Sequence, residues 1–135
     1  MNFIVFALLL SLAGPLFLMP VEKILPYPYL VEEAVKLAVV CLILKAKPSK
    51  NAFWFLVIFA GLLFSFSETI FYLTNIFTLG KFGLFPQRLV LTSFLHSGTT
   101  FLIAFFGKKG GWWWVTGFLG AVLIHGIYNL LVFSF

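Results

Sequence analysis

Acidic residues are scarce in this chain. Its 135 residues include only four, namely Glu22, Glu32, Glu33 and Glu68. Charged residues together make up 10% of the sequence, against 62% hydrophobic residues. A water-soluble domain needs much more charge to cover its surface, so this composition excludes an ordinary soluble globular protein. It indicates a chain whose natural solvent is the lipid bilayer.

Cysteine is almost absent, since Cys41 is the only one. A single thiol excludes an internal disulfide framework and a cysteine-based metal site. The net charge is +5, but the basic residues gather in short loops, as they do between membrane helices. We therefore expect contact with the anionic lipids of the bilayer and no binding of nucleic acid.

The apolar residues form five long runs. A membrane helix needs about 20 residues, so the chain has room for about five helices in a single integral-membrane domain. We predict an all-α fold, a polytopic transmembrane helical bundle with spans at residues 2–19, 29–44, 52–79, 86–106 and 113–133. The first span is expected to be a retained helix that is interrupted near Gly14 and Pro15. The third is longer than a bilayer requires, which predicts a tilted, protruding or broken helix.

The basic residues predict an orientation in the cell membrane. Three lysines lie between the second and third spans, and two lie between the fourth and fifth. The opposite side carries Lys23, Lys81 and Arg88. Because cytoplasmic loops carry the excess of positive charge, we expect a cytoplasmic N-terminus.

Three of the four acidic residues lie inside apolar runs. A carboxylate in hydrocarbon is costly unless it has a partner or faces a cavity, which makes it a candidate for function. At about 1.5 Å per residue, three glutamates and two histidines fall in the membrane half opposite the lysine loops, namely Glu32, Glu33, Glu68, His96 and His125. Helical spacing places further polar residues on the same faces, namely Lys36, Tyr72, Arg88, Thr92, Thr99 and Asn129. The pattern predicts a water-accessible cavity between helices.

Several kinds of chemistry fit such a set of side chains. Glutamate and histidine can activate water for hydrolysis, hold a metal ion, or relay protons and ions. There is no HExxH motif, which excludes a zincin-type helix. A purely structural alternative is that Glu32 pairs with Lys36 and Glu68 pairs with Arg88 to hold the bundle together.

The polar residues also form motifs in a recognisable order. The run 32–36 is EExxK, the run 68–72 is ExxxY, Arg88 and His96 follow, and the run 125–129 is HxxYN. In this order they resemble the PrsW family of intramembrane proteases, over roughly residues 29–129. That family is related to the CAAX-prenyl endopeptidase and bacteriocin-processing family, whose EExxxR and FxxxH motifs fit less well. Here Lys36 comes one position earlier than that arginine would, and Thr92 stands where that phenylalanine would be.

The resemblance implies an intramembrane endopeptidase that cuts a membrane-tethered or single-pass protein. Glu32 would activate the water molecule, with Glu33 as the second candidate. His96 would orient the water, and His125 and Asn129 would donate hydrogen bonds to the oxyanion. With the orientation that the lysines predict, the active site would lie in the extracytoplasmic half of the membrane.

The resemblance also implies supporting roles. Glu68 would be a further carboxylate of the site, as a metal ligand or as the partner of Arg88. Lys36 would orient the glutamate pair, and Tyr72 belongs to the same supporting group.

The cofactor and the assembly stay open at this point. The ligand set of Glu32, Glu68, His96 and His125 permits Zn²⁺, although a glutamate mechanism without tightly held metal is preferred. Family members are usually longer, so a second copy in a homo-oligomer could supply a missing wall of the cavity. Two other functions are considered: a non-catalytic peptide-binding or immunity protein of the same fold, and a small ion or proton transporter.

Overall fold

The computed structural model describes residues 2–22, 24–78, 80 and 82–133. Within these ranges there are five helices and no strand: α1 (Phe3–Glu22), α2 (Pro28–Lys45), α3 (Lys50–Thr78), α4 (Leu84–Gly107) and α5 (Trp113–Phe133). The predicted all-α bundle is confirmed, and each helix matches one predicted span to within about a turn. The predicted end at residue 79 lies outside the described residues, as do Lys23 and Lys81.

Four of the described helices, α1, α3, α4 and α5, are long and apolar enough to cross a membrane. Helix α2 differs because it carries Glu32, Glu33, Lys36 and Lys45 within 18 residues. The first three of these are buried, with at most 6% exposure. Helix α2 contacts all four other helices, so these three charges lie inside the bundle. Its composition is therefore that of an interior helix.

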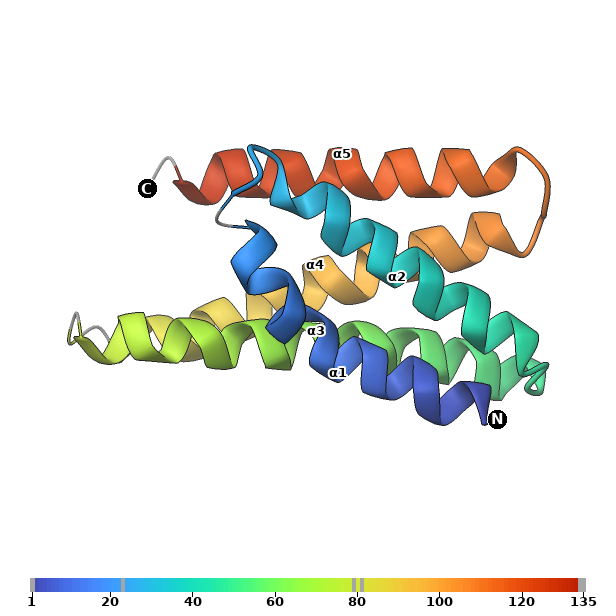
Figure 1. Cartoon of the computed structure of the whole chain (residues 1–135), viewed down its shortest axis with the longest axis horizontal. Helices are drawn as coiled ribbons and strands as arrows, with labels where there is room; N and C mark the ends of the chain where they lie inside the picture. The colour runs from blue at the N-terminus through green and yellow to red at the C-terminus, as the bar shows by residue number, and fades with distance from the viewer. Residues whose placement is uncertain (1, 23, 79, 81, 134–135) are drawn as a thin grey trace.

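Helix α1 was expected to be interrupted near Gly14 and Pro15, but it runs unbroken from Phe3 to Glu22 with both Pro15 and Pro20 inside it. Figure 1 shows instead that α1 bends along its length, so that its second half approaches the start of α2. Proline removes one helical hydrogen bond and crowds the preceding turn, which bends a helix that neighbouring helices hold in place. A Cβ atom on Gly14 would lie 3.2 Å from Val35 Cγ1 of α2, so glycine permits close contact at this bend.

Helix α3 is continuous over 29 residues, or about 43 Å at 1.5 Å per residue. This excludes a break and leaves tilt or protrusion to absorb the excess over a hydrocarbon core of about 30 Å. Gly61 allows α3 to cross α4 at very short range, because a Cβ atom there would lie 2.5 Å from Ser97 Cα.

Helices α4 and α5 also pack closely. A Cβ atom on Gly117 would lie 3.2 Å from Ile103 Cα, and Ala121, four residues further on, is fully buried. The close approach of another helix that these two small residues favour is therefore found.

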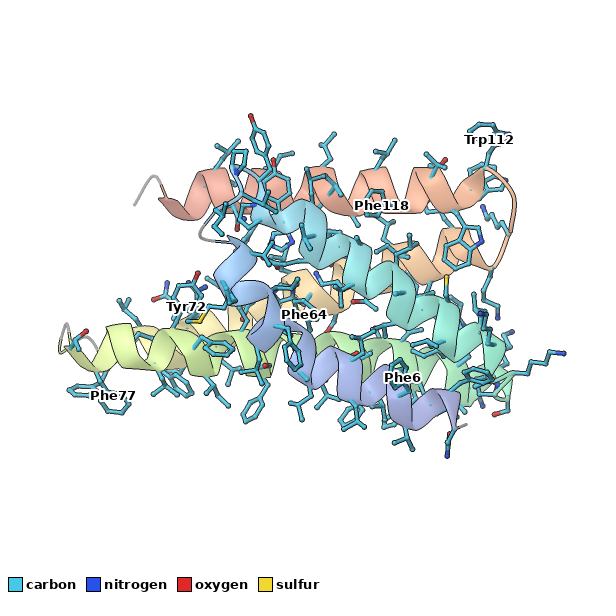
Figure 2. All side chains as sticks on the ribbon, viewed as in Figure 1. Phe6, Phe64, Tyr72, Phe77, Trp112 and Phe118 are labelled. Carbon is cyan, nitrogen blue, oxygen red and sulfur yellow. The ribbon has the colours of Figure 1, made fainter. Side chains whose placement is uncertain are left out.

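The interior is divided along the length of the bundle. The half that holds the α2–α3 and α4–α5 loops contains an apolar core, made of Ala7, Val39, Val40, Ile43, Phe53, Val57, Ala60, Ile103, Ala104 and Ala121. The other half contains the buried charges. In Figure 2, Phe64 lies in the middle of the bundle, and Trp112 and Phe77 lie at opposite ends. Trp112 is 86% exposed.

Candidate functional site

Four helices bring their ionisable side chains to one place in the polar half of the bundle. Helix α2 contributes Glu32 and Glu33, α3 contributes Glu68, α4 contributes His96 and α5 contributes His125. The two histidine rings meet edge to face with their centroids 5.3 Å apart. Residues that are separated by up to 93 positions in the sequence thus form one cluster, which is the arrangement that their matching depth along the helices predicts.

Glu33 is the anchor of this cluster. It is fully buried, and its Oε1 accepts hydrogen bonds from Lys36 Nζ at 2.6 Å and from His125 Nδ1 at 2.7 Å. Lys36 also donates to Thr99 Oγ1 at 3.0 Å and lies over the ring of Phe64. A buried carboxylate with two charge-assisted partners is fixed in place, so Glu33 is suited to position other groups.

Glu68 of α3 bonds a cation and a histidine, as Glu33 does on α2. Its Oε1 accepts a hydrogen bond from Arg88 Nη2 at 2.9 Å, and its Oε2 accepts one from His96 Nε2. The guanidinium of Arg88 in turn stacks on the ring of Tyr72, 3.5 Å from its centroid. Figure 2 shows Tyr72 further along α3 than Phe64, toward the end of the bundle that Phe77 marks.

Each histidine is therefore bonded to a carboxylate through one ring nitrogen. An ionised carboxylate only accepts hydrogen bonds, so the bonded nitrogens, His96 Nε2 and His125 Nδ1, carry the protons. In the neutral rings this leaves a lone pair on His96 Nδ1 and on His125 Nε2. His96 Nδ1 is buried and has no hydrogen-bond partner among the described residues. His125 Nε2 lies 3.6 Å from Glu32 Oε2.

Glu32 completes a triad with the two histidines. One possible ligand atom from each of Glu32, His96 and His125 lies within 4.8 Å of the others, and all three residues are buried. Two imidazoles and one carboxylate at this separation are groups that can bond a water molecule or ligate a metal ion. The triad can therefore hold a water molecule or a metal ion.

The predicted structural pairs are found in part. Arg88 does pair with Glu68, as that interpretation expected. Lys36 forms its ion pair with Glu33, three residues earlier on α2. Both glutamates of these pairs also bond a histidine, so the pairs are one layer of a larger network around the triad.

Asn129 lies one turn beyond His125 on α5 and is half-buried. The bonds that hold Glu33 and Glu68 do not involve its carboxamide. Its position is compatible with the donor role that the family resemblance implies.

Three residues that contact the site were not predicted as site residues from the sequence, namely Tyr29, Phe64 and Thr99. Tyr29 packs against His125 with ring centroids 5.9 Å apart, and Phe64 packs against His96 at 5.1 Å. A Cβ atom on Gly126 would lie 3.3 Å from Tyr29 Cζ, so the glycine makes room for the tyrosine ring. Thr99 was recognisable as part of a polar helix face, but its bond to Lys36 was not. Nothing in the sequence distinguishes Phe64 from its many neighbouring phenylalanines.

Comparison of the chain with protein-family models, with curated proteins and with solved structures finds no match.

Proposed function

We propose that this protein is an intramembrane endopeptidase that hydrolyses a peptide bond of a membrane-tethered or single-pass protein. The observation that carries the proposal is the buried triad of Glu32, His96 and His125, whose ligand atoms lie within 4.8 Å of one another. The resemblance of the motif order to the PrsW family supplies the peptide bond as the target. The same cluster contains further motif residues in direct contact with one another, since Lys36 bonds Glu33 and Arg88 bonds Glu68.

Glu32 is the residue that acts on the attacking water. It faces the unprotonated nitrogen of His125 and is accompanied by His96 in the triad. A carboxylate at hydrogen-bond range of a water removes a proton as the water attacks the carbonyl carbon, and returns it to the leaving amine. Glu33 does not take this part, because its bonds to Lys36 and His125 hold it as a positioning residue. In this proposal Asn129, one turn beyond His125 on α5, donates to the oxyanion.

The donor set of the triad fits Zn²⁺. Two imidazoles and one carboxylate are a known set for catalytic zinc, which keeps a further position for water. Histidine ligands of metals usually donate their other N–H to a carboxylate, and both histidines do so here, to Glu68 and to Glu33. In a zinc form of the site, Glu32, His96 and His125 would hold the ion, with Glu68 behind His96, and Glu32 would then be a ligand in place of the base. A bound zinc ion supplies an activated water and polarises the substrate carbonyl.

The proposed site lies in the extracytoplasmic half of the cell membrane, with the N-terminus in the cytoplasm. Five lysines support this orientation, because they occur at the end of the bundle opposite to the triad, at Lys45, Lys47, Lys50, Lys108 and Lys109. Among the described residues of the two lysine-containing loops and their flanks there is no acidic residue.

The decisive experiment is cleavage in a reconstituted membrane. Purified protein and single-pass membrane proteins are incorporated into liposomes, and new peptide termini are identified by mass spectrometry. We expect termini that appear with the native chain and disappear with Glu32→Gln and with His125→Ala. Termini that persist in both variants would refute the proposal. Peptide binding without cleavage by the native chain would also refute it, in favour of a non-catalytic binding protein.

Metal content is measured separately. We expect about one zinc per chain in the native protein, and a loss of that zinc in His96→Ala. The control is Ser97→Ala, the neighbouring residue on α4, whose hydroxyl points to Ile58 O at 3.5 Å and away from the triad. Cleavage that continues without any bound metal would establish the glutamate mechanism that the sequence alone favours.

A further inference from the structure

The buried cluster has one partly exposed edge. Among its ionisable side chains, exposure is at most 8% for Glu32, Glu33, Lys36, His96 and His125. It rises to 18% for Glu68 and to 25% for Arg88. The pair formed by α3 and α4 is therefore the side on which a molecule from outside first meets the charged groups of the site, and Arg88 is the cation there.

The guanidinium of Arg88 is held in place, but not all of its N–H donors have an acceptor. Its guanidinium stacks on Tyr72 and donates from Nη2 to Glu68. A guanidinium carries five N–H donors in one plane. Within the described ranges, Glu68 is the one side-chain acceptor to which Arg88 donates a hydrogen bond. Its Nε is buried and lacks a hydrogen-bond partner among the described residues. The arrangement fixes the plane of the guanidinium and leaves donors for a further acceptor.

Glu68 connects Arg88 to the triad. One oxygen of this carboxylate bonds Arg88 and the other bonds His96, so a group bound to Arg88 lies about one carboxylate's width from His96. An extended peptide advances only about 3.3–3.6 Å per residue. A group on Arg88 and a peptide bond at the triad therefore belong to the same short stretch of a substrate.

We propose that Arg88 binds a carboxylate of the substrate close to the bond that is cut. This inference rests on the proposed endopeptidase function and names what its substrate carries. A fixed planar guanidinium recognises carboxylates through paired N–H bonds, which a lysine cannot reproduce. The carboxylate comes either from the C-terminus of the substrate or from an Asp or Glu side chain near the bond.

The test measures binding, so that it does not depend on cleavage. The probes are N-acetyl-leucine, its amide N-acetyl-leucinamide, and the α-amide of N-acetyl-aspartate. They are titrated by saturation-transfer NMR against the full chain in nanodiscs of neutral lipid. We expect a carboxylate probe to bind at least about tenfold more tightly than N-acetyl-leucinamide. The better of the two carboxylate probes identifies the source as a C-terminus or a side chain.

Three variants assign this difference to Arg88. The difference in affinity between the carboxylate probe and the amide should disappear in Arg88→Gln and shrink in Arg88→Lys. It should persist in Lys109→Gln, which removes a cation at the far end of the bundle. The double variant Arg88→Gln/Glu68→Gln removes both charges of the pair, so a loss of binding there is not caused by an unpaired Glu68. Glu32→Gln should bind like the native chain, which separates this inference from the failure of catalysis.

Two results would overturn the inference. Equal binding of acid and amide by the native chain would mean that Arg88 only neutralises Glu68. Displacement of the carboxylate probe by phosphatidylglycerol in the nanodisc, with Arg88 still required, would mean that the guanidinium binds a lipid phosphate instead.

Discussion

The two halves of this bundle have interiors of opposite polarity, although α2, α3, α4 and α5 run through both. One half is filled by aliphatic side chains such as Val39, Ile43 and Ile103, all at most 1% exposed. The other half is filled by glutamate, lysine and histidine at the same degree of burial, with Glu33 and His96 at 0%. The comparison shows that burial by itself does not separate the residues of the apolar core from those of the candidate site.

The difference has an energetic meaning. Helices in lipid gain little from burying apolar side chains, because the lipid tails are equally apolar, so packing at short range holds the apolar half. In the polar half every charge must be matched, since an unmatched charge in this environment is costly. We therefore expect the apolar half to tolerate small changes and the polar half to tolerate only paired ones.

The largest effect is expected on activity in the polar half. Replacing Glu32 with glutamine keeps the shape of the side chain and removes its ability to accept a proton. General base catalysis contributes about 10²–10⁴-fold, so cleavage should fall by about 10³-fold. The rate of product formation in liposomes measures this effect.

The control for this change comes from the apolar half. Ile43→Val alters another buried residue of the same helix and should keep the native cleavage rate. A similar loss of activity in both variants would mean that the effect reflects general disruption of α2.

The next largest effect is expected on stability. Lys36→Ala leaves Glu33 buried without its ammonium partner, and breaking one partner of a buried ion pair costs about 3–5 kcal/mol. The double variant Glu33→Gln/Lys36→Met removes both charges and should lose much less. The free energy of unfolding in mixed micelles measures both, and an equal loss in the two variants would contradict the role of the pair.

A smaller effect is expected where α3 crosses α4. In Gly61→Ala the new methyl group would lie 2.5 Å from Ser97 Cα, so the helices must separate, at a cost of about 1–3 kcal/mol. Gly98→Ala is the matched control, because a Cβ atom there meets no atom within 4 Å. The crossing is not as tight as described if both variants unfold at the same denaturant concentration.

These contrasts also explain how far the sequence could predict the molecule. The helices follow from the lengths of the apolar runs, and the polar cluster follows from the depth of five residues along those runs. The ion-pair partner of each charge cannot be predicted from the sequence. Lys36 is within reach of both Glu32 and Glu33 on the same helix face, and the side-chain rotamers decide between them. The contacts of Tyr29 and Phe64 depend on how the helices are rotated, which no local pattern encodes.

The smallest effect is expected from Ile43→Val itself. Ile43 is fully buried in the apolar core, and removing one methylene there leaves a small void that neighbouring side chains can partly fill. The expected loss is about 0.5–1.5 kcal/mol, without any change in metal content or cleavage rate. Thermal unfolding in detergent, read by circular dichroism, detects a loss of this size. A loss above the one measured for Lys36→Ala would reverse the comparison, because it would make the apolar half the more sensitive of the two.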